Sequence, residues 1–343
     1  MTTHSWPALA VPIVAAPMAG GPSTPQLVHA AAGAGGLGFL AAGYKTVTQL
    51  EAQIAETRTL GTERFGVNLF VPEPHTPPMD AVLTYRGHLA PIYTRLGIST
   101  PTPHDDDDAF AAKVQLVLEH RVPVVSFTFG LPQQEIVEQL HRNGTAVAVT
   151  VTTPDEARAA LALGIDALVV QGPEAGGHRA TFHVADQPTN TPLTELLGTV
   201  LALPELERDG AVIAAGGIHS AHQVRELLRL GAAAVQVGTA LLRAPEAGTK
   251  PVHADALVSQ QYAQTVVTRA FSGRPARGLR NAFIDEFDAA APAAYPEVNQ
   301  LTAPIRAAAL DDASVQAMWA GTGHAWTQAR PAAEIIAELA GPR

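Results

Sequence analysis

The sequence of 343 residues contains no cysteine. This absence excludes disulfide bonds, thiolate metal sites, iron–sulfur clusters and a cysteine nucleophile. Basic residues are also scarce, because 22 lysines and arginines stand against 32 acidic residues and give a formal net charge of −10. Neutralising the phosphates of a nucleic acid requires clustered lysine and arginine, so no nucleic-acid partner is expected.

Long hydrophobic runs and a basic leader are missing from the N-terminus. The first 18 residues read MTTHSWPALAVPIVAAPM, and Pro7, Pro12 and Pro17 interrupt their apolar residues. This pattern predicts neither a signal peptide nor a membrane span, and a cytoplasmic location is the default expectation.

No cluster of metal ligands is apparent, and no metal site is expected. The acidic run from Asp105 to Asp108 cannot direct four consecutive side chains at one cation. It is interpreted as the solvated start of a helix, where negative charge is favoured.

What the chain does contain is typical of a globular protein with a large core. Apolar residues make up 47% and charged residues 16%, with 29 glycines and 27 prolines spread along the sequence. The length exceeds an average domain but suits a (β/α)₈ barrel with insertions. We therefore expect residues 1–343 to form a single domain.

Short runs rich in Val, Ile and Ala alternate with longer stretches of helical period. About eight strands are predicted, which begin near Val11, Leu37, Phe65, Val122, Thr145, Ala167, Ala211 and Ala233. Helix starts are indicated by Thr24 with Pro25, by Thr153 with Pro154 and by Ser220. Eight such units favour an α/β fold of the closed (β/α)₈ TIM-barrel type over a doubly wound sheet.

Two segments lie outside the repeated strand–helix pattern of the barrel. The stretch from Pro72 to Pro103 predicts a helical insertion after the third strand that covers part of the active-site face. After Leu242 the strand count is complete, so residues 1–242 are expected to form the barrel core and residues 243–343 a C-terminal extension packed on it. Apolar surface on this extension could equally serve a homodimer.

Catalytic residues of such barrels follow the carboxyl ends of the strands. The first strand ends in PMAGGPSTP, where Gly20 and Gly21 allow a close approach to a ligand and Met18 can lie beside a ring system. A simple tight turn explains the glycines equally well. Asn68, in GVNLFVP, could bind the edge of a heteroaromatic ring or a neighbouring loop.

The sixth strand ends in QGPEAGGHRATF, which is the most specific segment of the chain. Gln171 closes the strand, and Gly176 and Gly177 precede His178 in a glycine-rich loop. A histidine can accept a carbon-bound proton near neutral pH, because its unperturbed pKa lies close to the working range. His178 is therefore the predicted catalytic base, whereas His29, His88, His183 and His219 lack this context.

The seventh and eighth strands end in AAGGIHS and VQVGTALL. Loops at these two places are the recurrent phosphate site of TIM barrels. Gly216, Gly217, Gly238 and Thr239 are accordingly predicted to bind a phosphate, and Gln236 to contact a ring.

The combination of PMAGGPSTP, AGGLGFLAAGY, GVNLFVP, SFTFGLP, QGPEAGGHR, AAGGIHS and VGTALL resembles the nitronate monooxygenases, formerly called 2-nitropropane dioxygenases. The later segments FSGRPARGLRN, AYPEVNQLTAPIRAAA and MWAGTGHA resemble the bacterial class I branch. The resemblance implies FMN as cofactor, a TIM-barrel fold, a nitronate or nitroalkane with dioxygen as substrates, and His178 as base. The residues that it and the strand-end pattern assign to FMN are Ala16, Pro17, Met18, Asn68, Gln171, Gly176, Gly177, Gly216, Gly217, Gln236, Gly238 and Thr239.

Phe129 and Tyr295 are expected by the same resemblance to line the substrate side. The sequence departs from the family at Ala180, where glycine is usual, at Asn299 and Gln300, where histidine is common, and at Thr322, where glutamine is expected. The departures at Asn299, Gln300 and Thr322 are expected near the substrate pocket or its lid and concern substrate preference more than flavin binding.

The expected reaction is the FMN-dependent oxidation of nitronates by dioxygen to carbonyl compounds with nitrite or nitrate, and nitroalkanes are a second candidate substrate. An NAD(P)H-dependent flavin reductase on the same fold, of the enoyl reductase or quinone reductase type, is the alternative. A flavin-free barrel that handles phosphates and a non-catalytic flavin-binding protein are further alternatives.

Overall fold

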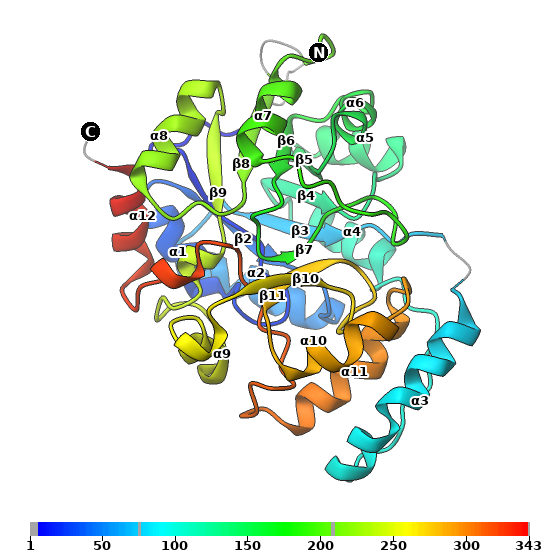
Figure 1. Ribbon diagram of the computed structural model, residues 1–343. Coiled ribbons are helices and arrows are strands. Elements are labelled where there is room, and N and C mark those ends of the chain that lie inside the picture. The colour runs from blue at the N-terminus through cyan, green and yellow to red at the C-terminus, as the bar shows by residue number, and fades with distance from the viewer. Residues whose placement is uncertain (1–5, 75–76, 207–209, 342–343) are drawn as a thin grey trace.

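The computed structural model describes residues 6–74, 77–206 and 210–341. Eight parallel strands form a closed barrel in the order β1-β2-β3-β4-β5-β6-β8-β9, which confirms the predicted TIM barrel (Figure 1). The strands are β1 (Ile13–Ala15), β2 (Leu37–Ala41), β3 (Gly66–Phe70), β4 (Val124–Thr128), β5 (Ala146–Val151), β6 (Ala167–Gln171), β8 (Ala211–Ala215) and β9 (Ala234–Val237). The barrel closes where Val14 of β1 pairs with Gln236 of β9.

The strands are buried on both faces, which explains why their sequences are continuous apolar runs and not alternating ones. Side chains such as Val14, Phe39, Val169 and Ile213 fill the inside of the barrel. Their sequence neighbours point outward and pack under the surrounding helices. The two layers together form the core of the barrel.

Eight helices in the described part of the chain surround the strands. They are α1 (Pro25–Gly33), α2 (Val47–Thr59), α4 (Phe110–Glu119), α5 (Gln134–Arg142), α6 (Pro154–Leu161), α7 (Leu193–Leu201), α8 (Ala221–Leu230) and α12 (Ala332–Ala340). The predicted caps Thr24, Thr153 and Ser220 each accept a hydrogen bond from a backbone N–H of the first turn. Helix α12 comes from the end of the chain and packs against both α1 and α8. Part of the segment expected as an extension thus completes the helical ring, and the domain boundary at Leu242 remains a prediction.

The predicted helical insertion is α3 (Met79–Leu96), which packs against α11 (Glu297–Ala308) beside the barrel (Figure 1). The interpretation of the acidic run as a wholly solvated helix start was wrong for Asp108. Its carboxylate lies 2.7 Å from the buried ammonium of Lys113 and accepts a hydrogen bond from the N–H of Tyr44, and α4 begins only at Phe110.

The rest of the chain after β9 forms a layer over one end of the barrel. It contains α9 (Pro251–Ala256), β10 (Thr265–Thr268), β11 (Ala276–Leu279), α10 (Ala282–Phe287) and α11, together with short 3₁₀ turns. A second hydrophobic cluster joins α3, α10 and α11 through residues such as Tyr85, Phe271 and Leu301. Strand β11 pairs on its other side with β7 (Gly177–His178), so the histidine loop belongs to the small sheet β10-β11-β7.

Among the described residues, no helix has both the length and the apolar composition that crossing a membrane requires.

Candidate active site

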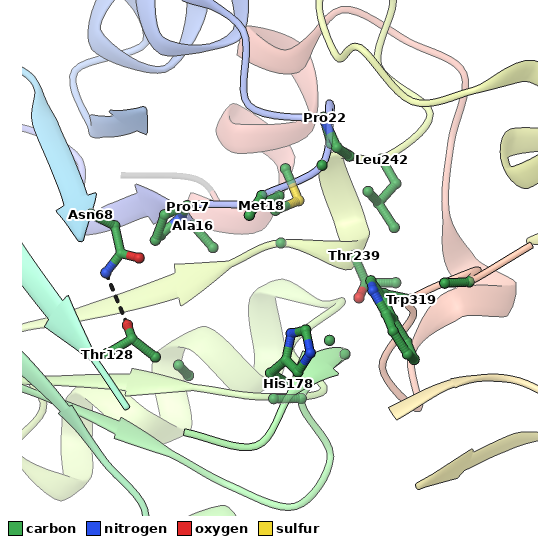
Figure 2. A pocket seen from close by; sticks show the side chains of 18 of the residues that line it. Ala16, Pro17, Met18, Pro22, Asn68, Thr128, His178, Thr239, Leu242 and Trp319 are labelled. Atoms are coloured by element: carbon green, nitrogen blue, oxygen red, sulfur yellow. Dashed lines mark hydrogen bonds between the residues drawn. The ribbon is translucent and has the colours of Figure 1, made fainter. Parts of the chain in front are cut away.

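A cavity of about 410 Å³ opens at the carboxyl ends of the barrel strands. With one exception, Tyr295, the structure brings every predicted cofactor, catalytic and substrate residue to its wall. The lining includes Ala16, Pro17, Met18, Asn68, Phe129, Gln171, Gly176, Gly177, His178, Gly216, Gly217, Gln236, Gly238 and Thr239. These residues come from six strand ends, so the barrel alone explains why they converge. Figure 2 labels Ala16, Pro17, Met18, Asn68, His178 and Thr239 among them.

Asn68 stands on the cavity wall at the end of β3. Its amide nitrogen donates to the hydroxyls of Ser126 and Thr128, each at 2.9 Å, and thereby ties β3 to β4. Its carbonyl oxygen has no hydrogen-bond partner in the described part of the chain and points into the cavity (Figure 2). Asn68 can therefore support the strand and offer one acceptor to a bound ring.

Gln171 lines the same cavity, but both ends of its amide are already engaged. Its nitrogen donates to the carbonyl oxygen of His178 at 3.1 Å, and its oxygen accepts from the N–H of Ala180 at 3.0 Å. The side chain thus fixes the loop that carries His178. Its predicted contact with a flavin ring stays a prediction.

His178 is held from its backbone and from its ring. The backbone pairs with Ala276 of β11, and Nε2 lies 2.8 Å from the hydroxyl oxygen of Ser272. The ring meets Phe129 and Trp319, each with ring centroids 5.5 Å apart. Figure 2 shows the imidazole projecting into the cavity opposite Met18 and near Trp319.

The imidazole of His178 is electrically neutral in this setting. Burial, and then the positive charges of Arg274 and Arg306, lower its pKa to about 3. A neutral imidazole keeps a lone pair available, which a proton acceptor needs.

Tyr295 was predicted to line the substrate side, and this stays a prediction, although its ring contacts two residues of the cavity wall. Its ring packs edge-on against Phe129 and His178, with centroids 5.8 and 6.2 Å away. Burial raises the pKa of its hydroxyl well above the usual value, and the neighbouring Tyr44 adds to this effect. Tyr295 therefore supports the residues that face the cavity.

The predicted phosphate loops after β8 and β9 leave several N–H groups free. Those of Gly217, Gly238 and Thr239 have no hydrogen-bond partner within the described residues, whereas the pairing of Ala215 with Gln236 directs the N–H of Gly216 towards β9. Gly217 has a φ of +68°, and a Cβ there would lie 2.7 Å from the Cβ of Glu174. The backbone at this point consequently requires glycine, and the free donors suit an anion.

The departures from the family pattern fall in three different places. Ala180 is completely buried behind the histidine loop. Asn299 lines the cavity, whereas Gln300 exchanges two hydrogen bonds of 2.9 Å with the backbone of His104. Thr322 was expected near the substrate pocket or its lid, and it lies beside Gly217 of the cavity wall, because its hydroxyl would be 3.0 Å from a Cβ on Gly217.

None of the residues of α3 lines the cavity wall, and whether the insertion covers part of the active-site face stays a prediction. It supports α11, which does line the wall through Asn299, Ala303 and Arg306.

Sequence reasoning missed Ser272, Arg274, Lys250, Arg306 and Trp319. Ser272, Lys250, Arg306 and Trp319 line the cavity, and the guanidinium of Arg274 lies 4.2 Å from the ring centre of Phe129. The segment FSGRPARGLRN carried a signal, because a serine and arginines flank a glycine and a proline there. Nothing in the sequence placed it beside His178.

No three or more His, Asp or Glu side chains gather as a metal site among the described residues. Although the chain has a net charge of −10, the described cavity wall contains Lys250 and Arg306 and no Asp or Glu. The site therefore suits anionic ligands, and His178 and His253 are the imidazoles on its described wall that could accept a proton.

The chain matches a family model described as nitronate monooxygenase over residues 4–341. It is 36% identical to a probable nitronate monooxygenase of Staphylococcus aureus over 336 residues, which cover 96% of this chain and 93% of that protein. Among solved structures it resembles a nitroalkane oxidase from Streptomyces ansochromogenes, with a TM-score of 0.91, 44% identity and coverage of 97% and 95% of the two chains. FabK from Thermotoga maritima is also similar, with a TM-score of 0.74, 26% identity and coverage of 96% and 92%.

Proposed function

Because the chain belongs to the nitronate monooxygenase family, a family of flavin-dependent oxidoreductases, we propose that it binds FMN in the cavity and oxidises nitronates with dioxygen. The products are carbonyl compounds with nitrite or nitrate. The observation that carries this proposal is the neutral His178 on the wall of a cavity that also offers unpaired N–H donors. Assignment to the class I branch remains a prediction.

The residues present fit FMN. The free N–H groups of Gly217, Gly238 and Thr239 would hold the phosphate beside Gly216, because phosphate binds well to N–H donors at strand and helix ends. Ala16, Pro17 and Met18 would lie against the ring, and the carbonyl oxygen of Asn68 would accept a hydrogen bond from its edge. When bound, FMN supplies the redox chemistry between the nitronate and dioxygen.

The chain's own residues bind and orient the substrate. Arg306 lines the cavity and would attract the negative charge of a nitronate. Phe129 and Trp319 flank His178 and would exclude water from one side of the substrate. Holding the substrate between these groups supplies the orientation that a fast reaction requires.

His178 has a role for each ionisation state of the substrate. With a neutral nitroalkane, a lone pair of its imidazole removes the proton from the carbon next to the nitro group. With a nitronate that has already formed in solution, no proton need move, and the imidazole only positions the anion.

Anaerobic mixing of the purified flavoprotein with a nitronate, and separately with NADH, tests the proposal. We expect the visible absorbance of the flavin to change when the nitronate is added and to stay constant when NADH is added. Rapid bleaching by NADH without a response to the nitronate would identify the NAD(P)H-dependent flavin reductase instead.

A further inference from the structure

The turn from Ser272 to Arg274 lies directly beside His178. Both side chains are almost completely buried, with exposed fractions of 2% and 1%. Gly273 between them has a φ of +82°, and a Cβ there would lie 2.1 Å from the carbonyl oxygen of Ala294. The turn is thus rigidly placed against the rest of the layer, and it fixes where the hydroxyl of Ser272 stands.

The hydroxyl of Ser272 has two neighbours but only one hydrogen. It lies 2.8 Å from Nε2 of His178 and 3.3 Å from the carbonyl oxygen of Arg274. A carbonyl can only accept, and this one has no other hydrogen-bond donor among the described residues. Buried carbonyl groups are almost always paired, so the hydroxyl hydrogen goes to Arg274.

It follows that Nε2 of His178 donates its hydrogen to the hydroxyl oxygen of Ser272, 2.8 Å away. A neutral imidazole carries its hydrogen on one nitrogen only, and the other nitrogen then holds a lone pair. Nδ1 of His178 has no hydrogen-bond partner in the described part of the protein, while the ring itself lines the cavity.

Arg274 reinforces this arrangement. Its guanidinium stacks on Phe129, donates to the carbonyl oxygen of Thr181 at 2.9 Å and lies 3.4 Å from the carboxylate of Glu73. These contacts hold the residue whose carbonyl oxygen orients Ser272. The positive charge also disfavours a second proton on the imidazole.

We propose that Ser272 is a positioning residue that keeps the proton of His178 on Nε2, so that Nδ1 is the nitrogen that meets the substrate. The part of this proposal that concerns the substrate rests on the proposed function. The position of the proton on His178 does not, because it can be measured without turnover.

The direct test is nitrogen NMR of the full-length, flavin-loaded protein labelled with ¹⁵N-histidine. The signals of His178 are assigned from their disappearance in His178→Asn. We expect a protonated Nε2 and an unprotonated Nδ1 in the wild type and in Ser272→Thr, which keeps the hydroxyl. Ser272→Ala should show a mixture of both tautomers. A hydrogen on Nδ1 in the wild type would overturn the proposal.

Kinetics with two forms of one substrate give the second readout. In Ser272→Ala, kcat/KM for neutral 1-nitropropane should fall on the order of tenfold to a hundredfold, since a buried group loses its partner. The value for the preformed nitronate of the same compound should change less than about threefold, because no proton is removed from it. Ser272→Thr, which keeps the hydroxyl, should have the wild-type kcat/KM for neutral 1-nitropropane.

The outcomes separate the two proposals. If the wild type oxidises neither compound, the proposed function fails, and the NMR spectra alone decide the role of Ser272. If Ser272→Ala lowers both values equally, or leaves both unchanged, Ser272 does not control the tautomer. Binding of FMN and the melting temperature are measured for each variant to recognise a general loss of structure.

Discussion

Replacing Gly217 by alanine is expected to weaken the binding of FMN through its phosphate. Gly217 has a φ of +68°, which costs a residue with a Cβ about 1–2 kcal/mol. The new Cβ would also lie 2.7 Å from the Cβ of Glu174 and 3.0 Å from the hydroxyl oxygen of Thr322. The backbone of the loop must therefore move, and its N–H groups move with it.

The size of the effect follows from the hydrogen bonds that are disturbed. A hydrogen bond to a charged group contributes roughly 1.5–3 kcal/mol, so misplacing one N–H should raise the Kd for FMN by roughly tenfold to a hundredfold. Quenching of flavin fluorescence on titration of the flavin-free protein measures this Kd. Riboflavin lacks the phosphate, so its Kd should be the same in the wild type and in Gly217→Ala.

Gly144→Ala is the matched control, because Gly144 has a φ of +83° but no atom within 4 Å of its Cβ position. It carries the same backbone strain in the connection between α5 and β5, at the opposite end of the barrel. Equal weakening of FMN and riboflavin in Gly217→Ala would refute the assignment of this loop to the phosphate. So would a Kd for FMN that matches that of Gly144→Ala.

Three further predictions concern the charged and titrating groups of the cavity. His178→Asn should impair the oxidation of neutral nitroalkanes far more than that of preformed nitronates, and equal losses in oxygen-consumption assays would exclude proton removal by His178. Arg306→Gln should raise KM for nitronates by about tenfold, whereas Arg280→Gln, which removes the same charge from the surface, should not. Burial lowers the pKa of His253 to about 4 in the folded protein, against 6.5 in the unfolded chain. The neutral imidazole therefore stabilises the fold fully above pH 6.5, and this contribution is lost as the pH falls from 6.5 towards 4. In urea unfolding, the free energy of unfolding should therefore fall less on acidification to pH 4.5 for His253→Gln than for the wild type. Equal falls in the two proteins would contradict the lowered pKa of His253.

The barrel could be predicted from the sequence because its signals are local. Each strand is a short apolar run, and Thr24, Thr153 and Ser220 cap their helices through groups only three residues away. The positions of the candidate cofactor residues followed from the same local signals, since carboxyl ends of parallel strands meet at one end of a barrel.

The rest of the site depends on contacts between distant segments. Ser272 reaches His178 because β11 pairs with β7, and Arg306 reaches the cavity because α3 supports α11 from outside. Hydrophobic periodicity does not encode such pairings. The same limitation applies to Tyr295, whose motif was recognised but whose contact with Phe129 depends on how the later layer packs.

The pairing of β7 with β11 also bears on how the enzyme is made. A chain emerging from the ribosome presents its N-terminal part first, so the glycine loops after β8 and β9 are synthesised before residues 272–277. Until that later strand docks, His178 lacks both its backbone partner and the hydroxyl of Ser272. The setting of His178 is thus completed by the C-terminal part of the chain, whereas most residues assigned to the cofactor belong to the ends of the barrel strands before it.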